Sequence, residues 1–168
     1  MPANPRNEHD VADLLQAVVN TLPNVEARSG QVTMATAIAD AIENERHLIV
    51  QAGTGTGKTL GYLVPAIASG KRIVVSTYTK ALQDQLAKHD LPVLSSALTP
   101  IIGRDISWAV LKGRNNYLCA QRITEIREPK QHKLDLQEFS TQVKSDIDKL
   151  VAWSETTTTG DSGDLSWS

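Results

Sequence analysis

The 168-residue sequence holds a single cysteine, Cys119, and lacks the marks of a secreted or membrane protein. One thiol excludes an internal disulfide framework and, within this chain, a metal site made of several cysteines. No stretch approaches the ~18 consecutive apolar residues of a membrane span, and the N-terminal "MPANPRNEHD" lacks the apolar core of a signal peptide. We therefore expect a cytoplasmic protein with no membrane partner.

The sequence also lacks a strong net charge, which is only −2, so composition gives no global sign of a nucleic-acid partner. The charge is unevenly distributed: residues 71–133 carry 11 basic and 5 acidic side chains, whereas residues 134–168 carry 2 and 7. A basic middle segment suits a phosphate backbone, but it is also common on solvated surfaces. Charge alone leaves a DNA or RNA partner open.

The glycine-rich stretch "QAGTGTGKTL" follows the apolar run "HLIV" and precedes "LGYLVPAIA", which is suited to a helix. Its spacing matches a phosphate-binding loop, with alanine where glycine is more usual. Such a loop holds a polyphosphate by main-chain N–H groups and by the positive end of the following helix. A flexible turn with a solvated lysine is the alternative, and the strand–loop–helix order disfavours it. The predicted nucleotide-binding residues are Ala52, Gly53, Thr54, Gly55, Thr56, Gly57, Lys58 and Thr59.

Two residues of this loop have a predicted chemical role. Lys58 would reach the β- and γ-phosphates, and the Thr59 hydroxyl would be a ligand of Mg²⁺ bridging them.

Periodicity predicts an α/β fold around this loop. Apolar residues at helical spacing predict helices over 11–22 and 31–45, and the β-branched runs in "HLIV", "RIVVST" and "ISWAVLKG" predict strands of a parallel sheet. Thr79 is a candidate cap for a helix over 80–89, with Leu82 and Leu86 facing inward. Helical spacing recurs after Asn115, over 117–127 and 135–153, and the Ser/Thr/Gly/Asp-rich 154–168 predicts loop or disorder.

Three further stretches, "RSGQ" at 28–31, "VVSTYTKALQDQL" at 74–86 and "LKGRNNYLC" at 111–119, resemble the N-terminal part of XPD/DinG-type superfamily 2 DNA helicases, most closely the bacterial DinG-like branch. The resemblance covers roughly residues 24–125. It implies ATP and Mg²⁺ as ligands and a partial RecA-like motor domain over 1–113, with a parallel sheet between helices. It also implies the start of a helical iron–sulfur insertion over 114–168.

The resemblance implies roles for individual residues. Gln31 matches the glutamine that reads the adenine edge, with Arg28 in support, although Gln31 also suits an ordinary helix start. Thr77, Thr79 and Gln83 match the segment that contacts the backbone of single-stranded DNA; a helix cap with solvated polar side chains is the alternative.

The resemblance also covers residues near Cys119, for which it implies contacts with DNA phosphates and a ligand of an iron–sulfur cluster. Lys112 and Arg114 are candidates for pairing DNA phosphates or, equally, for solvated charges. Cys119 matches the first ligand of a 4Fe-4S cluster, but a cluster needs four thiolates, so we expect it only in a full-length parent. Without the resemblance, a lone cysteine is normally a small buried apolar group.

The sequence departs from the family in having no Asp-Glu box after Thr59 and no second motor domain. The predicted parent function is ATP-dependent, 5′-to-3′ unwinding of single-stranded or forked DNA, whereas this chain looks truncated and is expected to bind nucleotide without turnover. Another P-loop NTPase and a stand-alone, non-catalytic nucleotide- or DNA-binding module remain alternatives. The oligomeric state is left open.

Overall fold

The computed structural model describes residues 10–22, 28–53, 55–127 and 140–165. The chain divides into two compact units, Met1–Val110 and Leu111–Ser168. Within the described residues, no helix has the length and apolar character needed to cross a membrane. The first unit carries the glycine-rich loop, and the second carries Cys119.

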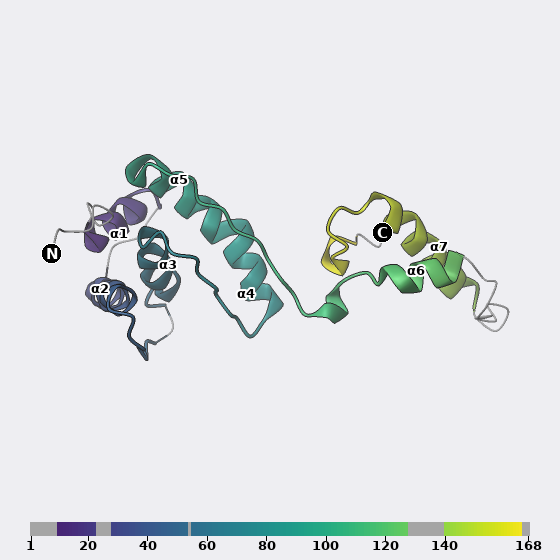
Figure 1. Ribbon diagram of the computed structural model, residues 1–168, viewed down its shortest axis with the longest axis horizontal. Helices are drawn as coiled ribbons and strands as arrows, with labels where there is room; N and C mark the ends of the chain where they lie inside the picture. Colours follow the sequence, from purple (N-terminus) through teal and green to yellow (C-terminus); the bar gives the residue numbers. More distant parts are fainter. Residues whose placement is uncertain (1–9, 23–27, 54, 128–139, 166–168) are drawn as a thin grey trace. The chain divides into compact units, whose positions relative to one another are not determined.

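The described part of the first unit is built from helices that pack on one another (Figure 1). The helices are α1 (Val11–Asn20), α2 (Ser29–Glu43), α3 (Lys58–Ala68), α4 (Lys80–Gln85) and α5 (Leu91–Ile102). A π-helical turn, Leu86–Asp90, joins α4 to α5, so that these two helices form one continuous helical segment.

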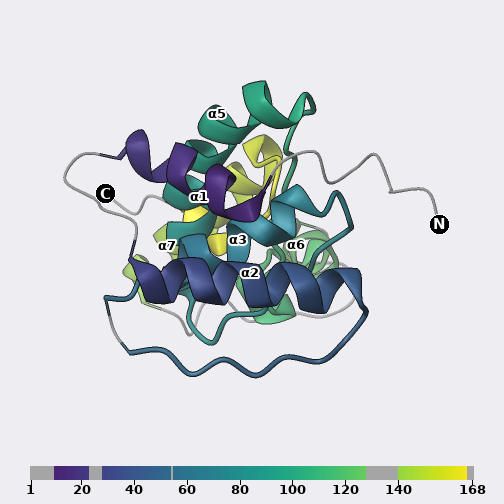
Figure 2. The ribbon, with the colours of Figure 1, turned by 90° about the vertical axis from the view of Figure 1, so that its left-hand side faces the viewer.

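The core of this unit lies between α1, α3 and α5, with α2 covering α3 (Figure 2). The apolar spacing predicted for α1 is confirmed, because the helix buries one face. Leu86 is buried as predicted, whereas Leu82 is exposed, so its predicted inward position is wrong. The buried cluster consists of Leu14, Leu15, Val18, Ala35, Leu63, Val64, Leu86, Leu94 and Leu98.

Helix α5 was missed by the sequence analysis because its sequence, "LPVLSSALTPII", contains two prolines. Pro92 is the second residue of α5 and directly follows the π-helical turn, whose wider hydrogen bonding, with the Leu91 N–H on the Leu86 carbonyl, marks where the α-helical ladder is interrupted. Pro100 lies near the other end, and the helix stops at Gly103, whose φ of 66° is the left-handed conformation that favours glycine. Leu94 and Leu98 then face the core, so burial outweighs the prolines.

The predicted strands are not present among the described residues. The runs "HLIV", "RIVVST" and "ISWAVLKG" form no strand ladder in this part of the chain, so the predicted parallel sheet is not confirmed. Figure 2 shows the first of them as a trace beside α2. β-Branched residues favour extended backbone, but a strand also needs a neighbouring strand to accept and donate its hydrogen bonds. Ile49 and Val74 are accordingly 97% and 89% exposed.

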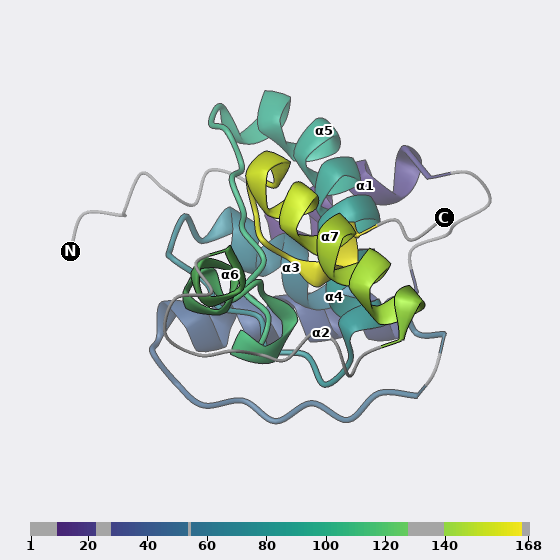
Figure 3. The ribbon, with the colours of Figure 1, turned by 90° about the vertical axis from the view of Figure 1, so that its right-hand side faces the viewer.

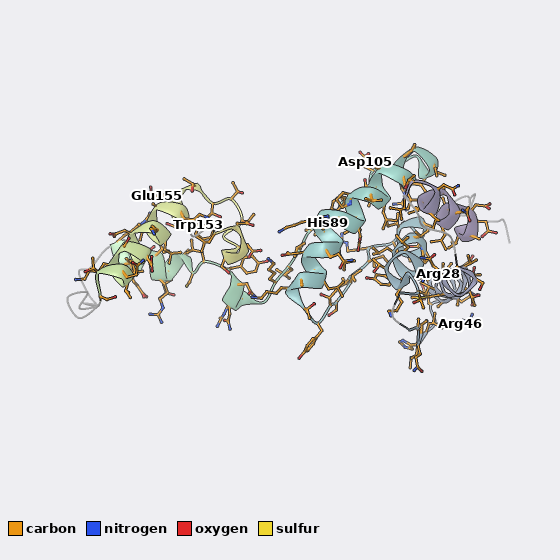
Figure 4. All side chains as sticks on the ribbon, turned by 180° about the vertical axis from the view of Figure 1, so that it is seen from behind. Arg28, Arg46, His89, Asp105, Trp153 and Glu155 are labelled. Carbon is orange, nitrogen blue, oxygen red and sulfur yellow. The ribbon has the colours of Figure 1, made fainter. Side chains whose placement is uncertain are left out.

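The described part of the second unit contains α6 (Ala120–Arg127) and α7 (Thr141–Thr156) (Figure 3). Arg127 joins them, because its Nη2 lies 3.0 Å from Oε1 of Glu155 and 2.9 Å from Oγ of Ser154. Figure 4 labels Glu155 and Trp153 on α7. The helix predicted over 135–153 is thus found at Thr141–Thr156, while Leu136 and Phe139 lie outside the described residues.

The expectation of loop or disorder for 154–168 needs a correction. The helix continues to Thr156, and a turn with a 3-10 segment at Ser162–Asp164 follows. Residue Asp161 forms an isolated antiparallel bridge with Tyr117. Of the two alternatives, loop is therefore the one found, in an ordered form, from residue 157 to residue 165.

Candidate nucleotide-binding site

The glycine-rich loop adopts a backbone that only glycine accommodates easily. Gly55 and Gly57 have φ angles of 76° and 73°. Gly57 is the N-cap of α3, which begins at Lys58, two residues before the predicted helical run at 60–68. The loop thus leads directly into the first turn of a helix, where unpaired N–H groups and the helix dipole favour an anion.

Lys58 lies over this loop. Its ammonium Nζ donates to the carbonyl oxygens of Ala52, at 3.0 Å, and Gly53, at 2.7 Å. The Thr56 hydroxyl donates to the same Gly53 carbonyl at 3.0 Å. The side chains of Thr56 and Lys58 therefore hold the loop backbone by bonding to its carbonyl oxygens. Thr54, predicted to be part of this site, lies outside the described residues.

Two side chains of the "RSGQ" segment contact the loop from α2. The buried amide of Gln31 donates through Nε2 to the Gly57 carbonyl at 2.9 Å. Arg28, which is labelled in Figure 4, donates through Nη1 to the Gly55 carbonyl. A Cβ on Gly57 would lie 2.3 Å from Gln31 Nε2, so a side chain there would displace the Gln31 amide as well as occupy a backbone conformation that favours glycine. The structure brings together the predicted loop, Gln31 and Arg28.

Thr59 has a neighbour that the sequence analysis missed. The Tyr62 side chain forms a hydrogen bond with Thr59, one turn along α3. Burial raises the pKa of Tyr62, the Thr59 hydrogen bond opposes this rise, and the charge of Asp90 adds to it. Spacing of three residues on one helix face is the signal that would have found this pair.

These donors fit a magnesium–polyphosphate group. The loop offers main-chain N–H groups, one ammonium and one hydroxyl, which suit phosphate oxygens and a Mg²⁺ ion that keeps most of its ligands from phosphate and water. Among the described residues, no group of three or more His, Cys, Asp or Glu side chains gathers to hold a metal.

The residues predicted to contact DNA lie around the start of α4. The Thr79 hydroxyl caps this helix, because it accepts from the Leu82 N–H at 3.3 Å, which confirms the predicted cap. Thr77 Oγ1 donates to the Thr79 carbonyl at 3.2 Å, and Gln83 is half-buried. Between the two threonines, Tyr78 is fully exposed. The segment thus presents one free aromatic ring beside two threonines held by local hydrogen bonds.

Cys119, the predicted cluster ligand, belongs to the second unit, whereas the glycine-rich loop and the start of α4 belong to the first. Cys119 is exposed and immediately precedes α6. A 4Fe-4S cluster needs four protein ligands, and the chain's one thiol does not by itself fit such a group. The alternative of a solvated charge at Lys112 is wrong, because its side chain is only 8% exposed and pairs with Asp161, while its pairing with a DNA phosphate stays a prediction. Arg114 is exposed.

A glycine-rich loop that caps a helix, followed by lysine and threonine at its first two positions, is typical of P-loop nucleotide-binding proteins. The family model for DEAD/DEAH box helicases matches residues 32–115, half of the sequence. The chain belongs to this helicase family, whose fold is RecA-like. The resemblance to DinG-type helicases found from motifs is thereby confirmed.

Curated relatives agree with this assignment. The ATP-dependent helicase DinG of Mycobacterium tuberculosis is 43% identical over 166 residues, which cover 92% of this chain and 25% of that protein. The ATP-dependent DNA helicase YoaA of Escherichia coli is 42% identical over 144 residues, covering 86% and 21%. The 3′-5′ exonuclease DinG of Bacillus subtilis is 32% identical over 154 residues, covering 89% and 15%.

The chain spans about a quarter, or less, of the length of these relatives. No solved structure matches it.

Proposed function

We propose that this chain binds ATP with Mg²⁺ through the loop at 52–59 and forms part of the motor of an ATP-dependent DNA helicase. The observation that carries the proposal is the loop itself, whose left-handed glycines, helix N-terminus and Lys58 ammonium converge at one place. Family membership supports ATP as the nucleotide. We infer 5′-to-3′ movement and a single-stranded or forked DNA substrate from the resemblance to DinG-type enzymes.

Each residue of the site has a role in this proposal. Lys58 would leave the carbonyls of Ala52 and Gly53 to pair the β- and γ-phosphates, because an ammonium interacts more strongly with a phosphate than with neutral carbonyls. Thr59 would be the protein ligand of Mg²⁺, which neutralises charge on the transferring phosphate when bound. Gln31 would read the adenine edge with its amide oxygen, while its Nε2 stays on Gly57.

The proposed DNA contact is the start of α4. Thr77, Thr79 and Gln83 would position the strand, and the exposed ring of Tyr78 would stack on a base. Tyr78→Ala should weaken binding of a fluorescent oligothymidine at least about fivefold, since base stacking contributes ~1–3 kcal/mol. Tyr78→Phe, which keeps the ring, should bind as the unaltered chain does; equal weakening by both variants would contradict stacking.

We further propose that residues 1–113 belong to the first motor domain and residues 114–168 to the start of a helical insertion. The structure divides the chain close by, between Val110 and Leu111. Cys119 would be one thiolate ligand of a 4Fe-4S cluster in a longer protein of this family, and such a protein would act in the cytoplasm. Its other ligands would come from sequence outside this chain, which has no second cysteine.

Binding without turnover is the proposed state of the 168-residue chain. Hydrolysis of ATP in this family needs an acidic residue on Mg²⁺ and an arginine from a second domain, and no Asp-Glu pair follows Thr59 in the sequence. Phosphate release should therefore equal that of Lys58→Ala, with and without single-stranded DNA. A DNA-stimulated rate that Lys58→Ala abolishes would show a complete ATPase and overturn this part of the proposal.

A further inference from the structure

The turn after α7 packs on the segment that leads to Cys119. Figure 1 shows this turn returning beside the chain that precedes α6. Asp161 Oδ2 lies 2.6 Å from Lys112 Nζ, and the two side chains are only 15% and 8% exposed. Asp161 also forms the antiparallel bridge with Tyr117. An ion pair and a backbone bridge therefore meet at one residue of the turn.

Neighbouring hydrogen bonds extend this contact toward the cysteine. The Leu118 N–H donates to the Gly160 carbonyl at 2.7 Å, and the Lys112 N–H donates to the Tyr117 hydroxyl at 2.8 Å. Leu118 is the residue directly before Cys119, whose carbonyl accepts the first hydrogen bond of α6 from Ile123 at 3.1 Å. The backbone on both sides of the cysteine is thus fixed.

The turn is itself rigid enough to act as a support. Asp161 Oδ1 accepts from the Gly163 N–H at 2.9 Å, and Thr157 Oγ1 accepts from the Gly160 N–H at 2.9 Å. The carboxylate of Asp161 consequently shapes the turn with one oxygen and holds Lys112 with the other. Removing the charge of Asp161 breaks this buried ion pair, and breaking a buried ion pair from one side is strongly destabilising.

We propose that residues 157–165 form a clamp on the segment 111–119, and that Asp161 is a positioning residue that fixes where Cys119 is presented. Lys112 is the residue of this segment that forms the ion pair with Asp161. The proposal says how Cys119, the proposed thiolate ligand, is positioned. It rests on that proposed function only for the reason why a clamp would be needed. The structural claim concerns this chain alone.

The test uses the 168-residue chain, in which Cys119 is the sole attachment point for a nitroxide spin label. Asp161→Asn keeps the shape of the side chain and removes its charge. It should increase exchange of the Leu118 amide at least tenfold by NMR and sharpen the spectrum of the label at Cys119. Asp164→Asn is the matched control, because Asp164 lies in the same 3-10 segment, is exposed and accepts from Thr159 Oγ1 at 2.6 Å.

Two more variants separate positioning from general damage. Lys112→Arg keeps the ion pair and should retain slow exchange and a broad spectrum. The double variant Lys112→Gln, Asp161→Asn leaves no buried charge unpaired and should regain much of the protection lost in Asp161→Asn. If Asp161→Asn behaves as Asp164→Asn does, or if the double variant is no better than the single one, the clamp is refuted.

Nucleotide binding to the same variants distinguishes this inference from the proposed function. The loop at 52–59 belongs to the other unit, so Asp161→Asn should bind an ATP analogue with unchanged affinity. Loss of the clamp with intact nucleotide binding would support the inference alone. Iron binding by Cys119 is measured separately, in a longer protein of the family, and its absence would remove the purpose of the clamp without removing the clamp.

Discussion

The amide nitrogen of Gln31 lies 2.9 Å from the carbonyl oxygen of Gly57, and this hydrogen bond ties the "RSGQ" segment to the residue that begins α3. Gln31 is 4% exposed, the one polar side chain in the buried set of described residues. The Gly57 carbonyl also accepts from the Gly61 N–H at 3.1 Å. The Gln31 side chain thus supports the junction between the loop and α3, and the predictions for Gly57→Ala and Gln31→Ala depend on this contact.

Gly57→Ala should destabilise the fold. The new Cβ would lie 2.3 Å from Gln31 Nε2 and would sit on a backbone with a φ of 73°. A non-glycine residue in that region costs on the order of 1–3 kcal/mol. Gly53→Ala is the control, because its Cβ would have nothing within 4 Å. Urea unfolding followed by circular dichroism measures both, and an equal effect on the two variants would contradict the assigned geometry.

Gln31→Ala separates bracing from adenine recognition. If Gln31 both reads adenine and supports Gly57, the variant should bind ATP and GTP analogues equally weakly, whereas the unaltered chain should prefer ATP. Competition between the two nucleotides for a fluorescent analogue measures the ratio. A variant that weakens binding while still preferring ATP would limit Gln31 to its structural contact.

Asp90 makes stability depend on pH. Burial raises the pKa of Asp90, and hydrogen bonding from Gln85 and the charge of His89 oppose this rise. Because the folded chain binds this proton more tightly than the unfolded chain, the contribution of Asp90 to stability is present at acid pH and is lost as pH rises through the raised pKa.

Asp90→Asn should therefore raise the midpoint of thermal unfolding at pH 7, and the difference should disappear below the ordinary Asp pKa of 3.8. Asp105→Asn, at an exposed position, is the control for a change of net charge. A difference that grows on acidification would show the opposite sign.

The extended apolar segments should make the chain self-associate. Ile49 and Val74 are 97% and 89% exposed on backbone without a strand partner, which is a known route to aggregation. Association measured by sedimentation velocity should rise with concentration and fall in the Ile49→Lys, Val74→Lys variant. A monomer at all concentrations, with a sharp thermal transition, would contradict this expectation.

Local patterns in the sequence identified much of this structure. Apolar spacing found α1, glycine spacing found the loop and the start of α3, and Thr79 was recognised as a cap. Long-range contacts were not predictable in the same way. A strand depends on a partner elsewhere in the chain, and nothing near Lys112 indicates that Asp161 pairs with it. Burial of Leu94 and Leu98 likewise outweighs the prolines that hid α5.

In the loop at 52–59, the prediction from sequence and the observed geometry agree on the glycine-rich turn and the helix that follows it. Its glycine angles, its lysine and its helix all follow from one motif.

Binding of a fluorescent ATP analogue with Mg²⁺ to the 168-residue chain tests the central claim most directly. Affinity should be weak, with a Kd of about 1 mM, or ~4 kcal/mol, because part of the family's site lies outside this chain. Lys58→Ala should abolish binding, while Lys88→Ala, at an exposed position on the π-helical turn, should leave it unchanged. Equal binding by the Lys58→Ala chain would contradict the account.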